Sequence, residues 1–330
     1  MADRIRWGIV GTGGIASTFA EDLKLLPDAE IVAVGSRTQA SADAFGDRFG
    51  IAHRHVGYAE LAADPEVDAV YVAVPHNGHF EAALAAIHAR KAVLVEKPFT
   101  VNAAEARQLI DAARAGGTFL MEAMWVRFLP HFVLVRELLA EGRIGEVRAV
   151  ISDRGATLST DPLHRINNPE LAGGALLDLG IYPVSFASMV TGGRLPERVE
   201  AVARLTETGV DAQTSMVFEY PGGAHTVIST SLDARSANKA SITGTKGHIV
   251  LSQPWARTSP VEVILNDDAA YTTTLPHQGN GLRHQADEVG RCLRAGELES
   301  PVLPLDETLA VMRTLDLVRE RIGLRYPGEA

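Results

Sequence analysis

The start of the chain constrains its fold most, because a short apolar segment runs directly into a glycine-rich turn. Ile5–Val10 has the pattern of a buried strand, and Gly11-Thr-Gly-Gly-Ile-Ala16 follows it at once. An amphipathic pattern then predicts a helix from about Ile15 to Leu25, ended by Pro27. A strand, the pattern G-x-G-x-x-A and a helix in this order are typical of the dinucleotide-binding turn of a Rossmann fold.

Each residue type in this turn has its own physical reason. Gly11 allows the tight turn, Gly13 lets the backbone approach a pyrophosphate, and Ala16 keeps the helix close to the sheet. The first amides of the helix face the bound anion. The predicted cofactor-binding residues of the turn are Gly11, Thr12, Gly13, Gly14, Ile15 and Ala16.

The end of the next predicted strand, Glu30–Gly35, indicates which dinucleotide is bound. A site for NAD usually has Asp or Glu about 20 residues after the glycines, where it binds the ribose 2′-hydroxyl. Here Ser36 holds that place, with Arg37 and Thr38 beside it. A hydroxyl and a guanidinium suit a 2′-phosphate, although Arg37 could also be a surface residue at a turn. We therefore predict NADP in preference to NAD, bound in part by Ser36, Arg37 and Thr38.

Strand and helix patterns continue to alternate, which predicts parallel strands with right-handed crossovers. The strand Asp68–Val74 ends in the loop Pro75–His79, which should lie near the nicotinamide end of the cofactor. No carboxylate or third ligand is spaced to join His76 and His79 in a metal site, so capping a helix or contacting a ribose is the favoured interpretation. The predicted cofactor contacts from this loop are Pro75, His76, Asn77 and His79.

The segment Ala92-Val-Leu-Val-Glu-Lys-Pro-Phe99 places two charges at the carboxyl end of a buried strand. Pro98 ends the strand because it lacks a backbone donor. In open parallel sheets this edge is where ligands bind, and a partly desolvated lysine there is suited to chemistry. The alternative is a solvated charge pair at an ordinary strand end. Glu96 and Lys97 are predicted to contact the cofactor, and Lys97 to be catalytic.

The length of 330 residues suggests two domains. We place the boundary after residue 122, so that residues 1–122 form the dinucleotide-binding domain and residues 123–330 the substrate-binding and oligomerisation domain. Residues 199–264 read as successive strands with polar turns, which indicates a mostly antiparallel sheet. Two helices, at about 282–294 and 306–319, are predicted to end the chain. The expected fold class is α/β: a doubly wound parallel sheet followed by an α/β domain.

Composition limits the partners and the compartment. A net charge of −10 argues against a polyanion-binding surface, so we expect neither nucleic acid nor an anionic membrane as a partner. Cys292 is the single cysteine, which fits a reducing cytoplasm. We expect no leader before the first strand and no apolar run that spans a bilayer. His53 and His55 are interpreted as surface residues, and no metal ligands are predicted.

A second constellation lies in Gly173-Gly-Ala-Leu-Leu-Asp-Leu-Gly-Ile-Tyr-Pro183, which is predicted to open a helix. Asp178 and Tyr182 are four residues apart and therefore share one helix face. An unpartnered carboxylate in so apolar a segment would be costly, and Lys97 is a candidate partner. Together with Lys97 the pair would form a proton-transfer group, since a nearby cation favours a phenolate. The alternative is that Asp178 caps backbone amides and Tyr182 only packs.

These three motifs together resemble the glucose–fructose oxidoreductase/inositol dehydrogenase/MocA (Gfo/Idh/MocA) family, and the match spans both halves of the chain. The glycine turn is generic, whereas Glu96-Lys97-Pro98 followed by Gly173–Tyr182 is specific. The resemblance implies a Rossmann domain and a C-terminal domain whose large open sheet mediates oligomerisation, as a homodimer or homotetramer. It also implies that Lys97 contacts the reacting hydroxyl or carbonyl with help from Asp178.

Many members of the family have His where this chain has Tyr182. The tyrosine, with Met124-Trp-Val-Arg-Phe-Leu-Pro-His131, is similar to the branch of dimeric dihydrodiol dehydrogenases and NADP-dependent D-xylose dehydrogenases. This departure counts against an activity like that of inositol dehydrogenase. On this resemblance the candidate substrate-binding residues are Trp125, Arg127 and Trp255.

The expected function is reversible hydride transfer between NADP and a secondary alcohol or hemiacetal carbon of a sugar or cyclic diol. Tyr182 would accept the hydroxyl proton, Lys97 would stabilise the developing negative charge, and Asp178 would hold Lys97. Three alternatives stay open: a keto-sugar reductase of a biosynthetic pathway, a redox-neutral glycosidase that uses NAD, and a non-catalytic cofactor-sensing regulator.

Overall fold

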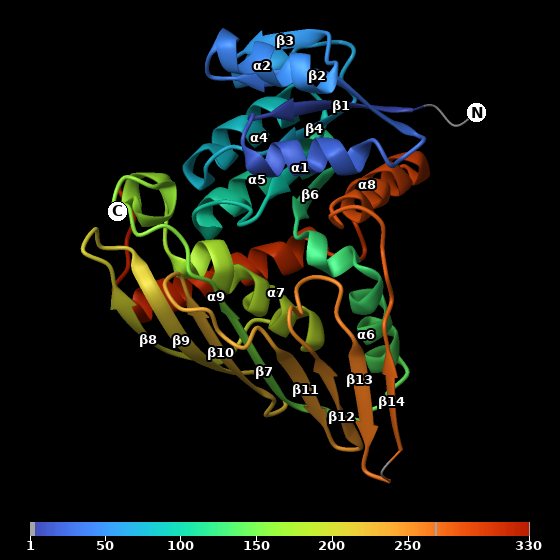
Figure 1. Ribbon diagram of the computed structural model, residues 1–330, viewed down its shortest axis with the longest axis vertical. Helices are drawn as coiled ribbons and strands as arrows, with labels where there is room; N and C mark the ends of the chain where they lie inside the picture. Colours follow the sequence, from blue (N-terminus) through green and yellow to red (C-terminus); the bar gives the residue numbers. More distant parts are fainter. Residues whose placement is uncertain (1–3, 268, 330) are drawn as a thin grey trace. The chain divides into compact units, whose positions relative to one another are not determined.

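A computed structural model describes residues 4–267 and 269–329, which form two compact units (Figure 1). The first unit contains the chain up to residue 125 together with residues 278–308, and the second contains residues 126–277 and the chain from 309 onward. The expected boundary after residue 122 lies close to the first crossing. The return of residues 278–308 to the first unit was not predicted.

The first unit is built on a six-stranded parallel sheet in the order β3-β2-β1-β4-β5-β6. This is the strand order of the Rossmann fold, which confirms the predicted doubly wound sheet. The order reverses beside β1, where ligands bind at the carboxyl ends of the strands. The strands are β1 (Ile5–Val10), β2 (Ala29–Ser36), β3 (His53–Val56), β4 (Ala69–Val72), β5 (Ala92–Glu96) and β6 (Leu120–Ala123).

Local sequence explains where the helices of the first unit begin and end. Thr38 and Asn102 cap two of them by accepting hydrogen bonds from the amides of Ser41 and Glu105. Gly50 and Gly117 end the same two helices with left-handed backbone. The helices are α1 (Gly14–Leu23), α2 (Gln39–Phe49), α3 (Tyr58–Ala62), the 3₁₀ turn η1 (His76–Gly78), α4 (His79–His88), α5 (Ala103–Gly116) and α8 (Arg283–Ala295).

A buried carboxylate explains why residues 278–308 return to the first unit. Asp22, on α1, accepts hydrogen bonds of 2.7 Å from the backbone amides of both Asn280 and Leu282. These amides precede α8, so Asp22 fixes the entry to that helix. The two partners lie about 260 residues away in sequence, which hides the contact from any local pattern.

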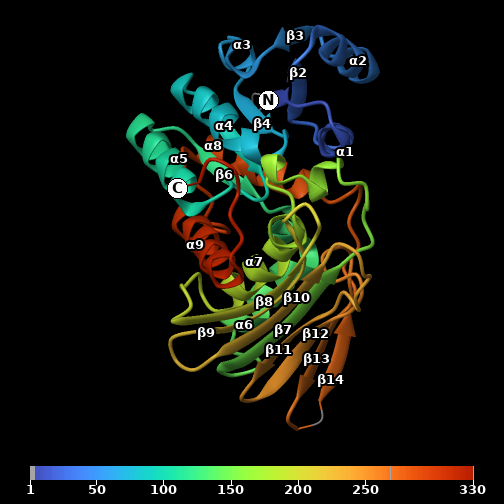
Figure 2. The same ribbon diagram turned by 90° about the vertical axis from the view of Figure 1, so that its left-hand side faces the viewer.

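The second unit is built on an eight-stranded sheet in the order β14-β13-β12-β11-β7-β10-β9-β8 (Figure 2). Among the described strands of this sheet β7 and β10 pair in parallel and the others pair antiparallel, which confirms the predicted mostly antiparallel sheet. The strands are β7 (Val147–Gly155), β8 (Arg198–Leu205), β9 (Asp211–Glu219), β10 (His225–Ser231), β11 (Ala240–Gly244), β12 (Gly247–Leu251), β13 (Val261–Leu265) and β14 (Ala270–Thr273).

The central helix of the second unit packs against β7 and β10 and is buried along its whole length. Residues 169–190 are long and apolar enough to cross a membrane, contrary to the expectation, but they form the core of this unit. The helical elements are η2 (Trp125–Phe128), α6 (Pro130–Ala140), η3 (Arg165–Asn167), η4 (Pro169–Leu171), the π-helical turn η5 (Leu176–Gly180) and α7 (Ile181–Val190). The last helix, α9 (Leu305–Ile322), begins in the first unit and ends in the second.

Candidate active site

The turn between β1 and α1 has the shape that a pyrophosphate requires. Gly11 has a φ of +107°, and a Cβ there would lie 2.3 Å from the carbonyl oxygen of Ala73, so only glycine fits. A Cβ on Gly13 or Gly14 would meet nothing within 4 Å, which leaves open space at the start of α1. Ala16 is fully buried against the sheet. These residues therefore fit a dinucleotide whose phosphates face the first amides of α1.

The end of β2 presents a hydroxyl and a free guanidinium. The Ser36 hydroxyl lies 3.5 Å from that of Thr12, which connects this strand end to the glycine turn. Arg37 is exposed, and no carboxylate of the described residues forms an ion pair with it. Thr38 caps α2 through a hydrogen bond from the amide of Ser41, so its hydroxyl also has a structural task.

The loop after β4 is held by His79. Its ring is buried, with Nδ1 2.8 Å from the carbonyl oxygen of Pro98 and Nε2 3.0 Å from that of Val74. Burial, together with the neighbouring His76, lowers the pKa of His79 to about 3, while the two carbonyl oxygens act in the opposite direction, because a neutral ring can donate to only one of them. His79 thus ties the strand-end loop of β4 to that of β5. Sequence reasoning expected helix capping or a ribose contact and did not find this bridge.

The end of β5 is positioned by buried acids. Glu96 accepts a hydrogen bond of 2.5 Å from the hydroxyl of Tyr71 and one of 3.2 Å from the amide of Lys97. Two residues later, the amide of Phe99 donates to the buried carboxylate of Glu122, at 3.1 Å. Lys97 is half-buried, as expected for a lysine at this edge. The contributions of Tyr71 and Glu122 were missed because they lie on neighbouring strands.

Asp178 and Tyr182 lie in the second unit at the junction of a π-helical turn with α7. Both side chains are buried, and the extra residue of a π turn is a feature often found at functional sites. Asp178 forms an ion pair with Arg165, whose Nη1 lies 3.3 Å from Oδ1. This arginine was not predicted, because it comes from an irregular loop rather than from a motif.

A buried acid holds the start of this helix. Asp211, at the beginning of β9, accepts hydrogen bonds from the amide of Leu176 at 2.8 Å and from the hydroxyl of Thr214 at 2.7 Å. Gly174 has a φ of +116°, and a Cβ there would lie 2.2 Å from Asp211 Oδ1. Burial raises the pKa of Asp211 to about 7. Glycine at position 174 therefore lets this carboxyl group approach the backbone, whereas a Cβ on Gly173 would meet the carbonyl oxygen of Ile166 at 2.5 Å.

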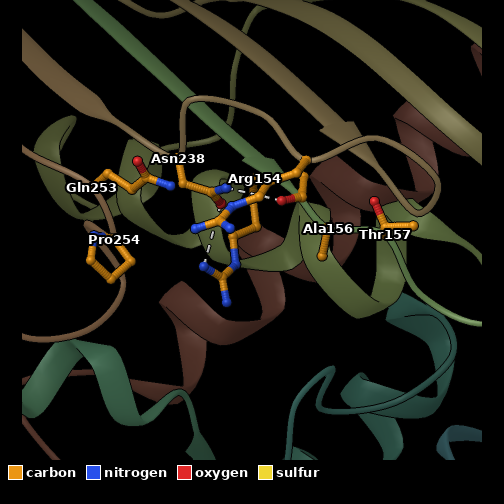
Figure 3. A pocket seen from close by; sticks show the side chains of 8 residues that line it. Arg154, Ala156, Thr157, Asn238, Gln253 and Pro254 are labelled. Carbon is orange, nitrogen blue, oxygen red and sulfur yellow. Dashed lines mark hydrogen bonds between the residues drawn. The ribbon is translucent and has the colours of Figure 1, made fainter.

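A cavity of about 490 Å³ opens at the end of β7 in the second unit (Figure 3). Arg154, at the end of β7, lines it, and the guanidinium carbon lies 5.4 Å from the centre of the Tyr182 ring. Asn238 lies next to Arg154 in the close-up, with its Oδ1 3.4 Å from Arg154 Nη1. The remaining lining residues are Gly155, Ala156, Thr157, Arg235, Gln253 and Pro254.

The three residues expected to bind substrate are all buried. Arg127 donates to the backbone carbonyl of Ser185 at 2.9 Å and so holds α7 in place. Trp255 packs between Phe132 and Phe186, and its indole donates to the carbonyl of Asp153 at 2.8 Å, while its neighbour Pro254 lines the cavity. Trp125 is also buried, at the end of the first unit. Their contact with a substrate stays a prediction.

His53 and His55 are not simply surface residues. Both rings bond to the same oxygen of Asp64, Oδ2, at 2.7 and 2.8 Å, and potential metal-ligating atoms of the three residues lie within 4.8 Å of one another. Burial alone would raise the pKa of Asp64, but hydrogen bonds from the amide of Glu66 and from both rings lower it to about 2. These hydrogen bonds hold the three side chains together, and sequence reasoning did not find this cluster.

Comparison with known proteins agrees with this geometry. Residues 5–124 match the model of the GFO/IDH/MocA oxidoreductase family with an NAD-binding Rossmann fold, and residues 132–250 match the model of the GFO/IDH/MocA C-terminal domain. Trans-1,2-dihydrobenzene-1,2-diol dehydrogenase from Bos taurus is 40% identical over 98% of this chain and 99% of its own length. The protein of that name from Homo sapiens is 39% identical, with the same coverage.

Solved structures show the same relationship. An aldose-aldose oxidoreductase from Caulobacter crescentus matches with a TM-score of 0.88 and 25% identity, over 96% of this chain and 97% of the other. KijD10, a 3-ketoreductase from Actinomadura kijaniata in complex with NADP and TDP-benzene, matches with a TM-score of 0.84 and 27% identity, over 97% and 98%. The expected resemblance is confirmed: this chain belongs to the GFO/IDH/MocA family of oxidoreductases, as a dehydrogenase that acts on CH–OH groups.

Proposed function

We propose that this dehydrogenase transfers a hydride between NADP and a secondary alcohol or hemiacetal carbon of a sugar or cyclic diol. One observation carries the assignment of proton chemistry: Tyr182 is buried close to Asp178, and its ring lies 5.4 Å from the guanidinium of Arg154, which lines a cavity large enough for a monosaccharide. Relatives named for diol and aldose oxidoreduction support this substrate class.

The proposed roles follow from the chemistry of each group. When bound, NADP supplies the hydride acceptor or donor. Tyr182 accepts the proton of the reacting hydroxyl during oxidation and returns it during reduction. Lys97 stabilises negative charge on the reacting oxygen, and Asp178 orients the charged groups around it.

Support for NADP comes from the end of β2. Ser36 and the exposed Arg37, without an acidic residue at that strand end, suit a 2′-phosphate better than a 2′-hydroxyl. The solved 3-ketoreductase complex also contains NADP. We further propose a cytoplasmic enzyme that acts as a homodimer, with no nucleic acid or membrane partner.

The substitution Lys97→Ala tests the mechanism. We expect turnover to fall by about 10²–10⁴-fold, because charge on the reacting oxygen loses its stabilising cation, while NADPH still binds. Turnover is followed by nicotinamide absorbance and binding by fluorescence. Lys246→Ala, at an exposed lysine of the second unit, is the matched control. Activity that survives in Lys97→Ala would refute the role given to this lysine.

A substrate panel separates the proposed function from its alternatives. Aldoses, inositols, diols and keto-sugars are offered with NADP or NAD in both reaction directions. Net change in nicotinamide absorbance supports a dehydrogenase, and a strict preference for keto-sugars with NADPH would identify a biosynthetic reductase. Sugar cleavage without net absorbance change would indicate a redox-neutral glycosidase. Cofactor binding without any turnover would favour a regulator.

A further inference from the structure

Arg154 is a partly buried cation that forms no ion pair with a carboxylate of the described residues. Its hydrogen bond is to the neutral amide of Asn238, and its other close neighbour is the ring of Tyr182. Its Nε is buried without a hydrogen-bond partner among the described residues. Burial lowers the pKa of Arg154, which reflects the cost of keeping this guanidinium charged.

Asp178 and Asp153 favour the charged form of Arg154 through space, but their direct hydrogen bonds and ion pair go to other groups. Asp153 accepts hydrogen bonds from the backbone amides of Asn238 at 2.6 Å and Lys239 at 3.1 Å. Asp178 forms its ion pair with Arg165. An anion that entered from outside the chain would therefore meet a desolvated guanidinium whose neighbouring acids already have other direct partners.

The cavity beside Arg154 is suited to receive that counter-charge. Its lining includes a second arginine, Arg235, and no Asp or Glu. Thr157, Asn238 and Gln253 add polar groups that could bind hydroxyls. The volume of about 490 Å³ accommodates a monosaccharide with one charged substituent.

We propose that the substrate carries an anionic group, a carboxylate or a phosphate, which Arg154 and Arg235 bind while its reacting hydroxyl lies at Tyr182. This inference rests on the proposed function and narrows its substrate class from neutral sugars and diols to acidic ones. A guanidinium binds either anion through paired hydrogen bonds. The competing explanation is that Arg154 acts only on Tyr182, by holding its ring.

The test compares a neutral sugar, its uronic acid and its 6-phosphate, each in the aldose and keto forms, with NADP or NADPH. We expect kcat/KM to be about 10–100-fold higher for at least one anionic form, as one or two charged hydrogen bonds provide. The KM of that form should rise with ionic strength. The uronate and phosphate arms identify which anion is bound.

Variants separate anion binding from positioning of Tyr182. Arg154→Gln should abolish the preference for the anion by raising its KM, Arg154→Lys should restore part of it, and Arg235→Gln should weaken it less. Arg148→Gln, at an exposed arginine of the same strand, is the control that leaves the preference unchanged. An equal loss for neutral and anionic forms in Arg154→Gln would overturn the proposal, as would equal kcat/KM values in the wild type.

Direct binding distinguishes failure of this inference from failure of the proposed function. Uronate and sugar phosphate are titrated calorimetrically into the wild-type protein and into Arg154→Gln, both saturated with NADPH. Binding that Arg154→Gln removes would support the anion site even if none of these compounds is oxidised or reduced. Absence of binding to the wild type would overturn it.

Discussion

At the scale of single residues, Asp211 lies fully buried beneath the first turn of the helix that carries Asp178 and Tyr182. Its pKa is raised to about 7, above the ordinary value of 3.8 expected in the unfolded chain. Its protonated form is therefore favoured by folding. The resulting stabilisation is complete below pH 3.8 and is lost as the pH rises through about 7.

The substitution Asp211→Asn should remove this pH dependence. Between pH 4 and 8 the free energy of unfolding of the wild type should fall relative to that of the variant, by up to about 1.4 kcal/mol per pH unit. The thermal midpoint of the wild type should fall with it. Calorimetry at four pH values measures the difference, with Glu207→Gln as an exposed carboxylate control. A difference that stays constant with pH would contradict the assignment.

At the scale of elements, the sequence was most informative where local chemistry decides structure. Strand β5 (Ala92–Glu96) and the Gly11–Ala16 turn were predicted from apolar runs and glycine spacing, because both signals are local. The π turn at Leu176–Gly180 was read as an ordinary helix start, since nothing in the residue pattern distinguishes the two.

Partners that are distant in sequence could not be predicted in this way. Asp22 and Asp211 hold backbone amides about 260 and 35 residues away, respectively, and Arg165 reaches Asp178 from an irregular loop. The cavity at Arg154 combines residues from β7 and from two loops, around 235–238 and 253–254. The motif residues of the candidate site were therefore found from sequence, whereas most of the groups that hold or surround them were not.

The turn from β2 to α2 is the element that should set the choice of cofactor. Arg37→Ala should raise the Kd for NADP by about 10–100-fold, because a guanidinium no longer binds the 2′-phosphate, and should change NAD binding little. Adding Ser36→Asp should reverse the preference, since an acid binds the 2′-hydroxyl and repels the phosphate. Fluorescence titration of both cofactors measures this. Unchanged NADP affinity in Arg37→Ala would remove the argument for NADP.

At the scale of the whole molecule, one face of the eight-stranded sheet exposes apolar side chains that a monomer would leave in water. Ile151, Val227 and Val217 are 54, 46 and 45% exposed, and they are paired as one row. This row crosses the neighbouring strands β7, β10 and β9 (Figure 2). Val202, on β8, is 71% exposed. Val202 pairs with Ser215, next to this row, whereas the partner of Val217 on β8 is Glu200. An exposed apolar row of this kind is typical of a surface that is buried on association.

We therefore expect a dimer in solution in which this face of one subunit packs against the same face of the other, as in a two-fold symmetric interface. Replacing both Val217 and Val227 by Glu places like charges on the row in each subunit and should convert the dimer to a monomer. Light scattering coupled to size-exclusion chromatography measures the mass. NADPH titration checks that the first unit of the variant is intact, because its cofactor turn lies in a separate compact unit. A wild-type monomer at micromolar concentration, or a Glu variant that stays dimeric, would exclude this face as the interface.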